Sequence, residues 1–167
     1  MFPTLSSFVH VWSQELESTQ KLFKHLTDKS LSQCIGPDGR TLGRLAWHVT
    51  TTIPEMMNRT GLAISSPDPE SPVPASAKQI FNTFSDAAVV LLEQVQANWT
   101  DASLQEEDNM YGEQWKRGKT LMALVLHLVH HRGQMTVLMR QAGLSIPGLY
   151  GPTREEWGMF GMKPPEV

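Results

Sequence analysis

Three of the chain's six histidines lie in one apolar, proline-free segment that runs from Lys119 to Gly143. An α-helix turns by about 100° per residue, so His127 and His131 project from one face, one turn apart, whereas His130 is turned about 60° from His127. Two imidazoles four residues apart on one helix face can bind a single metal ion through both rings. The segment therefore indicates metal chemistry, and the test of this interpretation is a third ligand elsewhere in the chain.

The same histidine pair has a structural interpretation that stays open at this point. Core histidines that bond a carbonyl group or a water molecule are common. The segment also lacks the general base of the zincin motif HExxH, because Leu128 follows the first histidine where that motif has glutamate. For His130, a bond to a carbonyl group or a place in a subunit contact is favoured over metal ligation.

Four amphipathic segments are expected to position these residues. Hydrophobic side chains recur at spacings of three and four over residues 4–28, 41–59 and 76–98, as well as in the histidine segment. This spacing predicts four α-helices, each with one buried stripe. The expected fold is therefore all-α, a four-helix bundle in which residues 1–167 form a single domain.

The connections between these helices have different compositions. Residues 61–75 are rich in proline and predict an extended linker, which at about 3.1 Å per residue is long enough to return the chain to its starting end. Residues 100–118 lose the helical pattern and are expected to form a long loop over a pocket. Residues 144–167 are irregular but apolar, which predicts a tail packed on the bundle or on a neighbouring chain.

The predicted helix over 41–59 carries polar residues on its apolar face. His48 shares that face with a mixed set of side chains: Leu45, Thr52, Glu55, Met56 and Arg59. A purely structural helix would place its polar residues on the opposite side. Two interpretations of Glu55 stay open: it orients a ligand or accepts a proton as a catalytic residue, or it forms a surface salt bridge.

The composition excludes several classes of function. Hydrophobic residues make up 40% and charged residues 19% of the chain, ordinary values for a globular domain, and the formal charge of −3 without a basic cluster argues against nucleic acid as a partner. The single Cys34 excludes an internal disulfide and fits a reducing compartment. No apolar run approaches the ~20 residues of a bilayer span, and the first 20 residues lack the lysines and arginines of a signal peptide. We expect a cytoplasmic protein that does not bind membranes.

Three segments of the sequence resemble the DinB/YfiT-like superfamily. They are TLGRLAWHV over residues 41–49, HLVHHRGQ over 127–134 and the ending GLYGPTREEW over 148–157. The resemblance implies that the four helices run in up-down-down-up order. It also implies that His48, His127 and His131 bind one divalent metal ion, zinc or nickel.

The resemblance leaves two classes of function open. Some members of the superfamily are transferases that use a low-molecular-weight thiol, which implies metal-dependent transfer to a small-molecule substrate, and others have been described as metal-dependent hydrolases. The competing class is a non-catalytic metal-binding or stress-response protein. Three neutral imidazoles leave positions on an ion open for water or substrate, which favours an enzyme, whereas a fourth protein ligand would favour a structural role.

Two further expectations concern the histidine helix. Gln134 lies two turns from His127 and is expected to act as a catalytic residue that bonds a substrate or orients a ligand, unless it bonds within the bundle. Other faces of the helix are also apolar, at Met122, Val125, Leu126, Val129 and Val137, and Gly133 permits a close approach. These faces predict a homodimer, and the competing account is that the 144–167 tail covers them.

Overall fold

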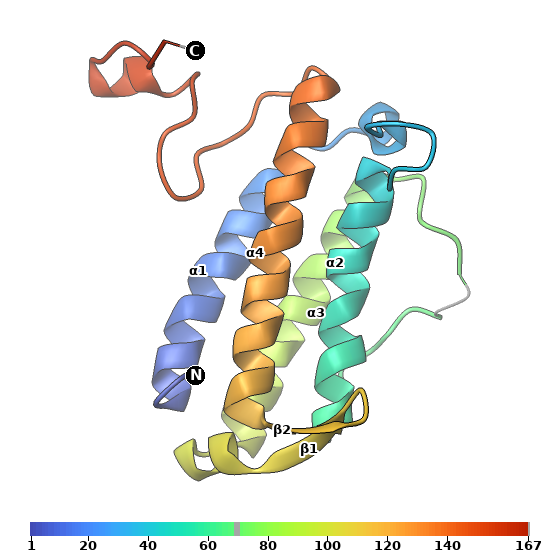
Figure 1. Ribbon diagram of the computed structural model, residues 1–167, viewed down its shortest axis with the longest axis vertical. Helices are drawn as coiled ribbons and strands as arrows, with labels where there is room; N and C mark the ends of the chain where they lie inside the picture. Colours follow the sequence, from blue (N-terminus) through green and yellow to red (C-terminus); the bar gives the residue numbers. More distant parts are fainter. Residues whose placement is uncertain (69–70, 167) are drawn as a thin grey trace.

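The computed structural model describes residues 1–68 and 71–166, and within this part of the chain four long α-helices form a bundle (Figure 1). They are α1 (Leu5–Phe23), α2 (Leu42–Met57), α3 (Ala77–Asn98) and α4 (Arg117–Gln141). Helices α1 and α4 run in one direction while α2 and α3 run in the other, which is the up-down-down-up order. The expected all-α four-helix bundle is confirmed.

Side chains at the helix ends explain where each helix begins. Thr4, Thr41 and Ser76 are the N-caps of α1, α2 and α3, and each hydroxyl accepts a hydrogen bond from the backbone N–H three residues later. Helix α1 ends five residues earlier than the sequence pattern predicts, because Thr27 caps a separate 3₁₀ helix, η1 (Asp28–Ser32). These caps fix the start of α2, from which His48 projects.

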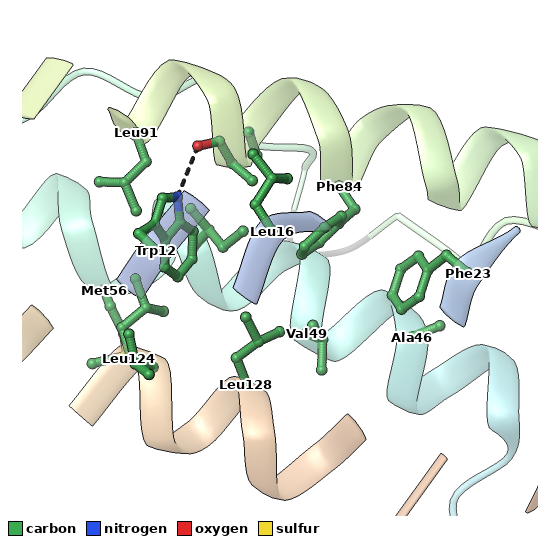
Figure 2. Close-up of a cluster of buried hydrophobic side chains, with 14 of the residues drawn as sticks. Trp12, Leu16, Phe23, Ala46, Val49, Met56, Phe84, Leu91, Leu124 and Leu128 are labelled. Carbon is green, nitrogen blue, oxygen red and sulfur yellow. Dashed lines mark hydrogen bonds between the residues drawn. The ribbon is translucent and has the colours of Figure 1, made fainter. Parts of the chain in front are cut away.

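The core lies along the axis of the bundle and takes side chains from all four helices (Figure 2). Trp12 of α1 is fully buried, and its indole N–H donates a 3.0 Å hydrogen bond to the carbonyl oxygen of Ala88 in α3. Leu124 and Leu128 of α4 enter the same core. Because α4 is held by this apolar stripe, the histidines beside it are presented toward α2 at a fixed rotation.

The expected loop over residues 100–118 is largely regular structure, so that prediction is wrong. The segment contains a 3₁₀ helix, η3 (Asp101–Gln105), and an antiparallel hairpin of β1 (Glu107–Met110) and β2 (Glu113–Lys116). Its two-residue turn places Tyr111 at φ 58° and Gly112 at φ 89°, the left-handed pair that matches strand twist. The hairpin crosses the end of the bundle beside α2 (Figure 1).

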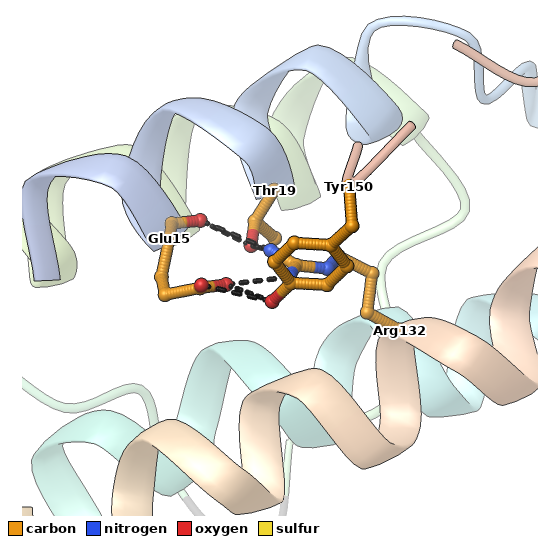
Figure 3. Close-up of polar contacts among 4 residues, drawn as sticks. All are labelled: Glu15, Thr19, Arg132 and Tyr150. Atoms are coloured by element: carbon orange, nitrogen blue, oxygen red, sulfur yellow. Dashed lines mark hydrogen bonds and ion pairs between the residues drawn. The ribbon is translucent and has the colours of Figure 1, made fainter. Parts of the chain in front are cut away.

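The first part of the C-terminal tail is anchored to α1 and α4 by a polar cluster (Figure 3). The buried guanidinium of Arg132 donates to the Glu15 carboxylate at 2.5 Å and to the Thr19 hydroxyl at 3.0 Å. The Tyr150 hydroxyl donates to the same carboxylate at 2.8 Å. The tail therefore packs on the bundle, as expected, through its first residues.

The last part of the tail contributes little to this packing. It contains a short 3₁₀ helix, η4 (Trp157–Phe160), which Figure 1 shows away from the four helices. Met159 is 82% exposed and Phe160 is 60% exposed, so neither packs on the bundle, which was one of the two contacts expected for the tail. Among the described residues, no helix has both the length and the apolar character that a bilayer span requires.

Candidate metal centre

Three histidine side chains from α2 and α4 converge at one point of the bundle. The Nε2 atom of His127 lies 3.2 Å from that of His48 and 3.1 Å from that of His131, and the ligand atoms of all three lie within 4.8 Å of one another. His131 is buried, whereas His48 and His127 are half-buried. The structure thus brings together the three residues that the sequence singled out.

The spacing of these nitrogens suits one ion. Bonds of 2.0–2.1 Å at angles between octahedral and tetrahedral would separate two ligand nitrogens by about 2.9–3.4 Å. Without an ion the cluster is poorly satisfied, because a neutral imidazole has one N–H and His127 Nε2 faces two other ring nitrogens. A cation at the centre would accept all three lone pairs. The donor set therefore fits a divalent transition metal.

Gln134 fixes the tautomer of His131. Its Oε1 lies 2.8 Å from Nδ1 of His131, and because an amide oxygen can only accept, Nδ1 carries the proton and Nε2 keeps its lone pair. Its Nε2 donates to Nε2 of His130 at 3.1 Å. Gln134 therefore bonds two histidine rings within the bundle, and His130 is bonded to a side-chain amide rather than to a carbonyl of the backbone.

The environment keeps the three imidazoles neutral. Burial, together with smaller effects of the neighbouring histidines, lowers the pKa of His48 and of His127 to about 4. Burial also lowers the pKa of His131, although its bond to Gln134 opposes this effect. Because a metal ligand must be the neutral imidazole, the cluster is in its binding form well below neutral pH.

Glu55 is held by two partners at the side of the site. Its carboxylate accepts a 2.7 Å hydrogen bond from the Tyr111 hydroxyl and pairs with Arg59 at 2.9 Å on the exposed face of α2. Burial and the bond to Glu55 raise the pKa of Tyr111 to about 12, so this phenol stays a donor at neutral pH. Glu55 thus forms the surface salt bridge that was one of its two interpretations, and it also borders the cavity that His48 lines.

Two cavities flank the histidines. The larger, of about 610 Å³, is bounded by His48 and by several charged or polar residues, among them Arg44, Glu55 and residues 66–68. The smaller, of about 350 Å³, is bounded by His131, Gln134 and a set that is mainly apolar: Ile35, Gly39, Arg40, Leu45, Val137 and Leu138. A small molecule in either cavity would lie against one of the three histidines.

The DinB family matches residues 1–165. The chain belongs to the DinB family. It is 46% identical over 167 residues to the uncharacterized protein YrdA of Bacillus subtilis (strain 168), with all of both chains covered. It is also similar to the crystal structure of a DinB-like protein from Bacillus cereus ATCC 10987, with 45% identity, a TM-score of 0.87, and coverage of 90% of this chain and 100% of that one.

A more distant DinB-like structure shows the fold alone. The protein YjoA from Bacillus subtilis is 20% identical, with a TM-score of 0.67 and coverage of 85% of this chain and 96% of that one. The bundle is therefore kept at low sequence identity among DinB-like proteins. The chemistry of the site in this DinB-family chain depends on its own side chains.

Sequence reasoning missed three residues beside the centre. Arg44 precedes His48 by four residues, so the helical spacing that placed Glu55 on this face could have placed Arg44 there too. Arg40 lies just before α2, and no local sequence pattern indicates that it would border the cavity at His131. Tyr111 lies in the segment that was expected to be a loop. Its contact with Glu55 joins residues 56 apart in the sequence, so no local pattern indicates it.

Proposed function

We propose that this DinB-family protein binds one divalent transition metal ion through His48, His127 and His131 and acts on a small molecule as a metal-dependent transferase that uses a low-molecular-weight thiol. The observation that carries the metal site is the convergence of three Nε2 atoms of neutral imidazoles, with spacings of 3.1 and 3.2 Å from the central ring. Zinc and nickel both suit three imidazole ligands.

A three-histidine site leaves the charge of an ion unneutralised. A divalent ion there would supply a Lewis acid that favours the ionised form of a thiol or of water at neutral pH. A thiolate is a far stronger nucleophile than a free thiol, whose pKa is about 8.5. Because His48 and His131 each line a cavity, ligands could approach the centre from either side.

The protein's own residues support this chemistry by position. Gln134 holds the ring of His131, and residues that hold ligand rings in other metalloproteins raise metal affinity in the same way. Glu55 contributes a carboxylate on the wall of the larger cavity, where it would orient a substrate or accept a proton while Tyr111 and Arg59 fix its position. These are the roles we propose for the two candidate catalytic residues.

Hydrolysis is the second candidate, and the position of Glu55 favours it. A carboxylate that shares a cavity with His48 is suitably placed to take a proton from water, as a general base does. In that case no thiol would be needed. A protein that binds the ion without catalysis is the third outcome that the experiment must distinguish.

Activity with and without thiol separates the three functions. Protein loaded with zinc or nickel is incubated with a small electrophile, alone and with each of several cellular thiols, and consumption is measured. We expect turnover that needs both metal and one thiol, and none from the His48→Ala/His127→Ala/His131→Ala variant. Turnover that needs metal but no thiol would establish hydrolysis instead. If metal-loaded protein is inactive with every thiol, the transferase proposal is wrong.

We also propose that the protein is a homodimer in the cytoplasm. Leu126 is 60% exposed on the outer face of α4, and a Cβ atom added at Gly133 would meet nothing within 4 Å, so another helix could approach there. Val125, by contrast, is buried within the chain and is unavailable for this contact. The cytoplasm is inferred from the single, half-buried Cys34, which fits a reducing compartment.

A further inference from the structure

The smaller cavity, beside His131, combines exposed apolar side chains with one charged side chain. Ile35 is 74% exposed and Val137 is 51% exposed at its edge, and Leu45 and Leu138 form apolar walls. One charged side chain, Arg40, also borders it. An apolar cavity with a single cation on its wall is complementary to a molecule with an apolar body and one negative charge.

Arg40 forms no ion pair within residues 1–68 and 71–166. Each ion pair among these residues joins an acidic side chain to a cation other than Arg40. Arg40 and His131 border the same cavity. A bound ion would add two more positive charges beside it. An anion is the ligand that would offset this local excess of positive charge.

We propose that the cavity bounded by Arg40, His131 and Val137 binds a small monoanion with an apolar chain, such as a carboxylate, whose charged group bonds Arg40 while its body lies against Ile35, Leu45 and Val137. The larger cavity differs, because Asp68 and Glu55 border it together with Arg44. This assignment names the substrate class of the proposed transferase. It rests on that proposed function only where it places the ligand beside the metal ion. The contacts with Arg40 and the apolar walls need no metal.

Hexanoate is a suitable probe, and its neutral isostere hexanamide and the short anion acetate are its matched comparisons. Binding of each is measured by isothermal titration calorimetry to zinc-loaded and to chelator-treated protein. We expect hexanoate to bind about tenfold more tightly than hexanamide, because a charge-assisted bond to Arg40 replaces a neutral one. We also expect it to bind about tenfold more tightly than acetate, because further methylene groups are buried.

Two exposed positions separate the charge from the apolar wall. Arg40→Gln should lower hexanoate affinity to that of hexanamide and leave hexanamide affinity unchanged. Val137→Ser should lower the affinities for hexanoate and for hexanamide by the same factor, so the ratio of the two affinities should be preserved. Arg44→Gln, which removes the same charge from the other cavity, is the matched control and should change neither affinity. Each of these side chains is at least half exposed or lies on the surface, so the variants should fold.

Several results would overturn the assignment. Equal affinity for hexanoate and hexanamide would exclude the charge contact, and equal affinity for hexanoate and acetate would reduce the site to simple anion binding. If Arg40→Gln and Arg44→Gln lower hexanoate affinity equally, the effect is one of overall charge and not of a contact in this cavity. Hexanoate binding that weakens as protein concentration rises would mean that a second copy of the chain occupies the cavity.

The same preparations distinguish this inference from the proposed function. If elemental analysis finds no zinc but chelator-treated protein still prefers hexanoate through Arg40, the cavity assignment stands and the metal-dependent function fails. If zinc is bound and neither the zinc-loaded nor the chelator-treated protein prefers hexanoate over hexanamide, the cavity assignment alone is wrong.

Discussion

At the scale of single residues, Gln134 supports the proposed metal site by holding the ring of His131. Its amide oxygen fixes the proton of His131 on Nδ1 and so leaves Nε2 free to bind an ion. Gln134→Leu should therefore lower zinc affinity by about 10–100-fold, the usual effect of removing a residue that orients a ligand. Competition with a chromophoric chelator measures this affinity. Gln141→Leu, the same change at an exposed position near the end of α4, is the control, and equal affinities in the two variants would contradict the role of Gln134.

The lowered pKa values of the histidines predict how stability depends on pH. In the unfolded chain these imidazoles bind protons near their ordinary pKa of 6.5, whereas in the folded protein His48 and His127 bind them only near pH 4. The metal-free protein should therefore have its full stability above pH 6.5 and lose part of it as the pH falls from 6.5 to 4. Urea unfolding at pH 7 and pH 5 measures the loss, which should be smaller in His48→Gln/His127→Gln. A loss of the same size in both proteins would refute this account.

At the scale of elements, α1 and α4 are joined by the buried pair of Glu15 and Arg132. Removing one member leaves the other charge buried and unpaired, so Glu15→Leu and Arg132→Met should each lower the free energy of unfolding by about 3–5 kcal/mol. The double variant should recover much of that loss, because two apolar side chains replace the pair. Chemical denaturation of the unaltered protein, the two single variants and the double variant gives the coupling free energy of the pair. If the losses in the free energy of unfolding simply add in the double variant, the pair does not act as a unit.

The elements themselves were predictable where the pattern is local. Hydrophobic spacing located all four helices, because the residues of one stripe lie only three or four positions apart. The hairpin was missed since each strand has four residues, too few to show alternation, and Gly112 alone marks its turn. The contact between Glu15 and Arg132 joins residues 117 apart and has no local signal.

The candidate site was predictable to a similar extent. Spacing in α4 paired His127 with His131, and the resemblance to the DinB/YfiT-like superfamily added His48. The bond from Gln134 was one of two alternatives until the structure showed the geometry. The position of Arg40 depends on how the turn before α2 approaches α4, so the sequence pattern could not supply it.

At the scale of the whole molecule, the outer face of α4 predicts self-association. Leu126→Glu should turn a homodimer into a monomer, because it places a charge at the centre of an apolar contact that is exposed in the single chain. Light scattering at micromolar concentration measures the mass. The expected values are twice 18.7 kDa for the unaltered protein and 18.7 kDa for the variant. A mass of 18.7 kDa for both would exclude the dimer, and the exposed face would then need another explanation.

The central claim, that His48, His127 and His131 hold one divalent metal ion, is tested most directly by the metal content of protein purified without chelator. Elemental analysis should find about one zinc or nickel ion per chain in the unaltered protein and almost none when all three histidines are replaced by alanine. His10→Ala/His25→Ala, which removes two histidines outside the cluster, should keep its metal. Equal metal in the unaltered protein and in the triple alanine variant would contradict the claim.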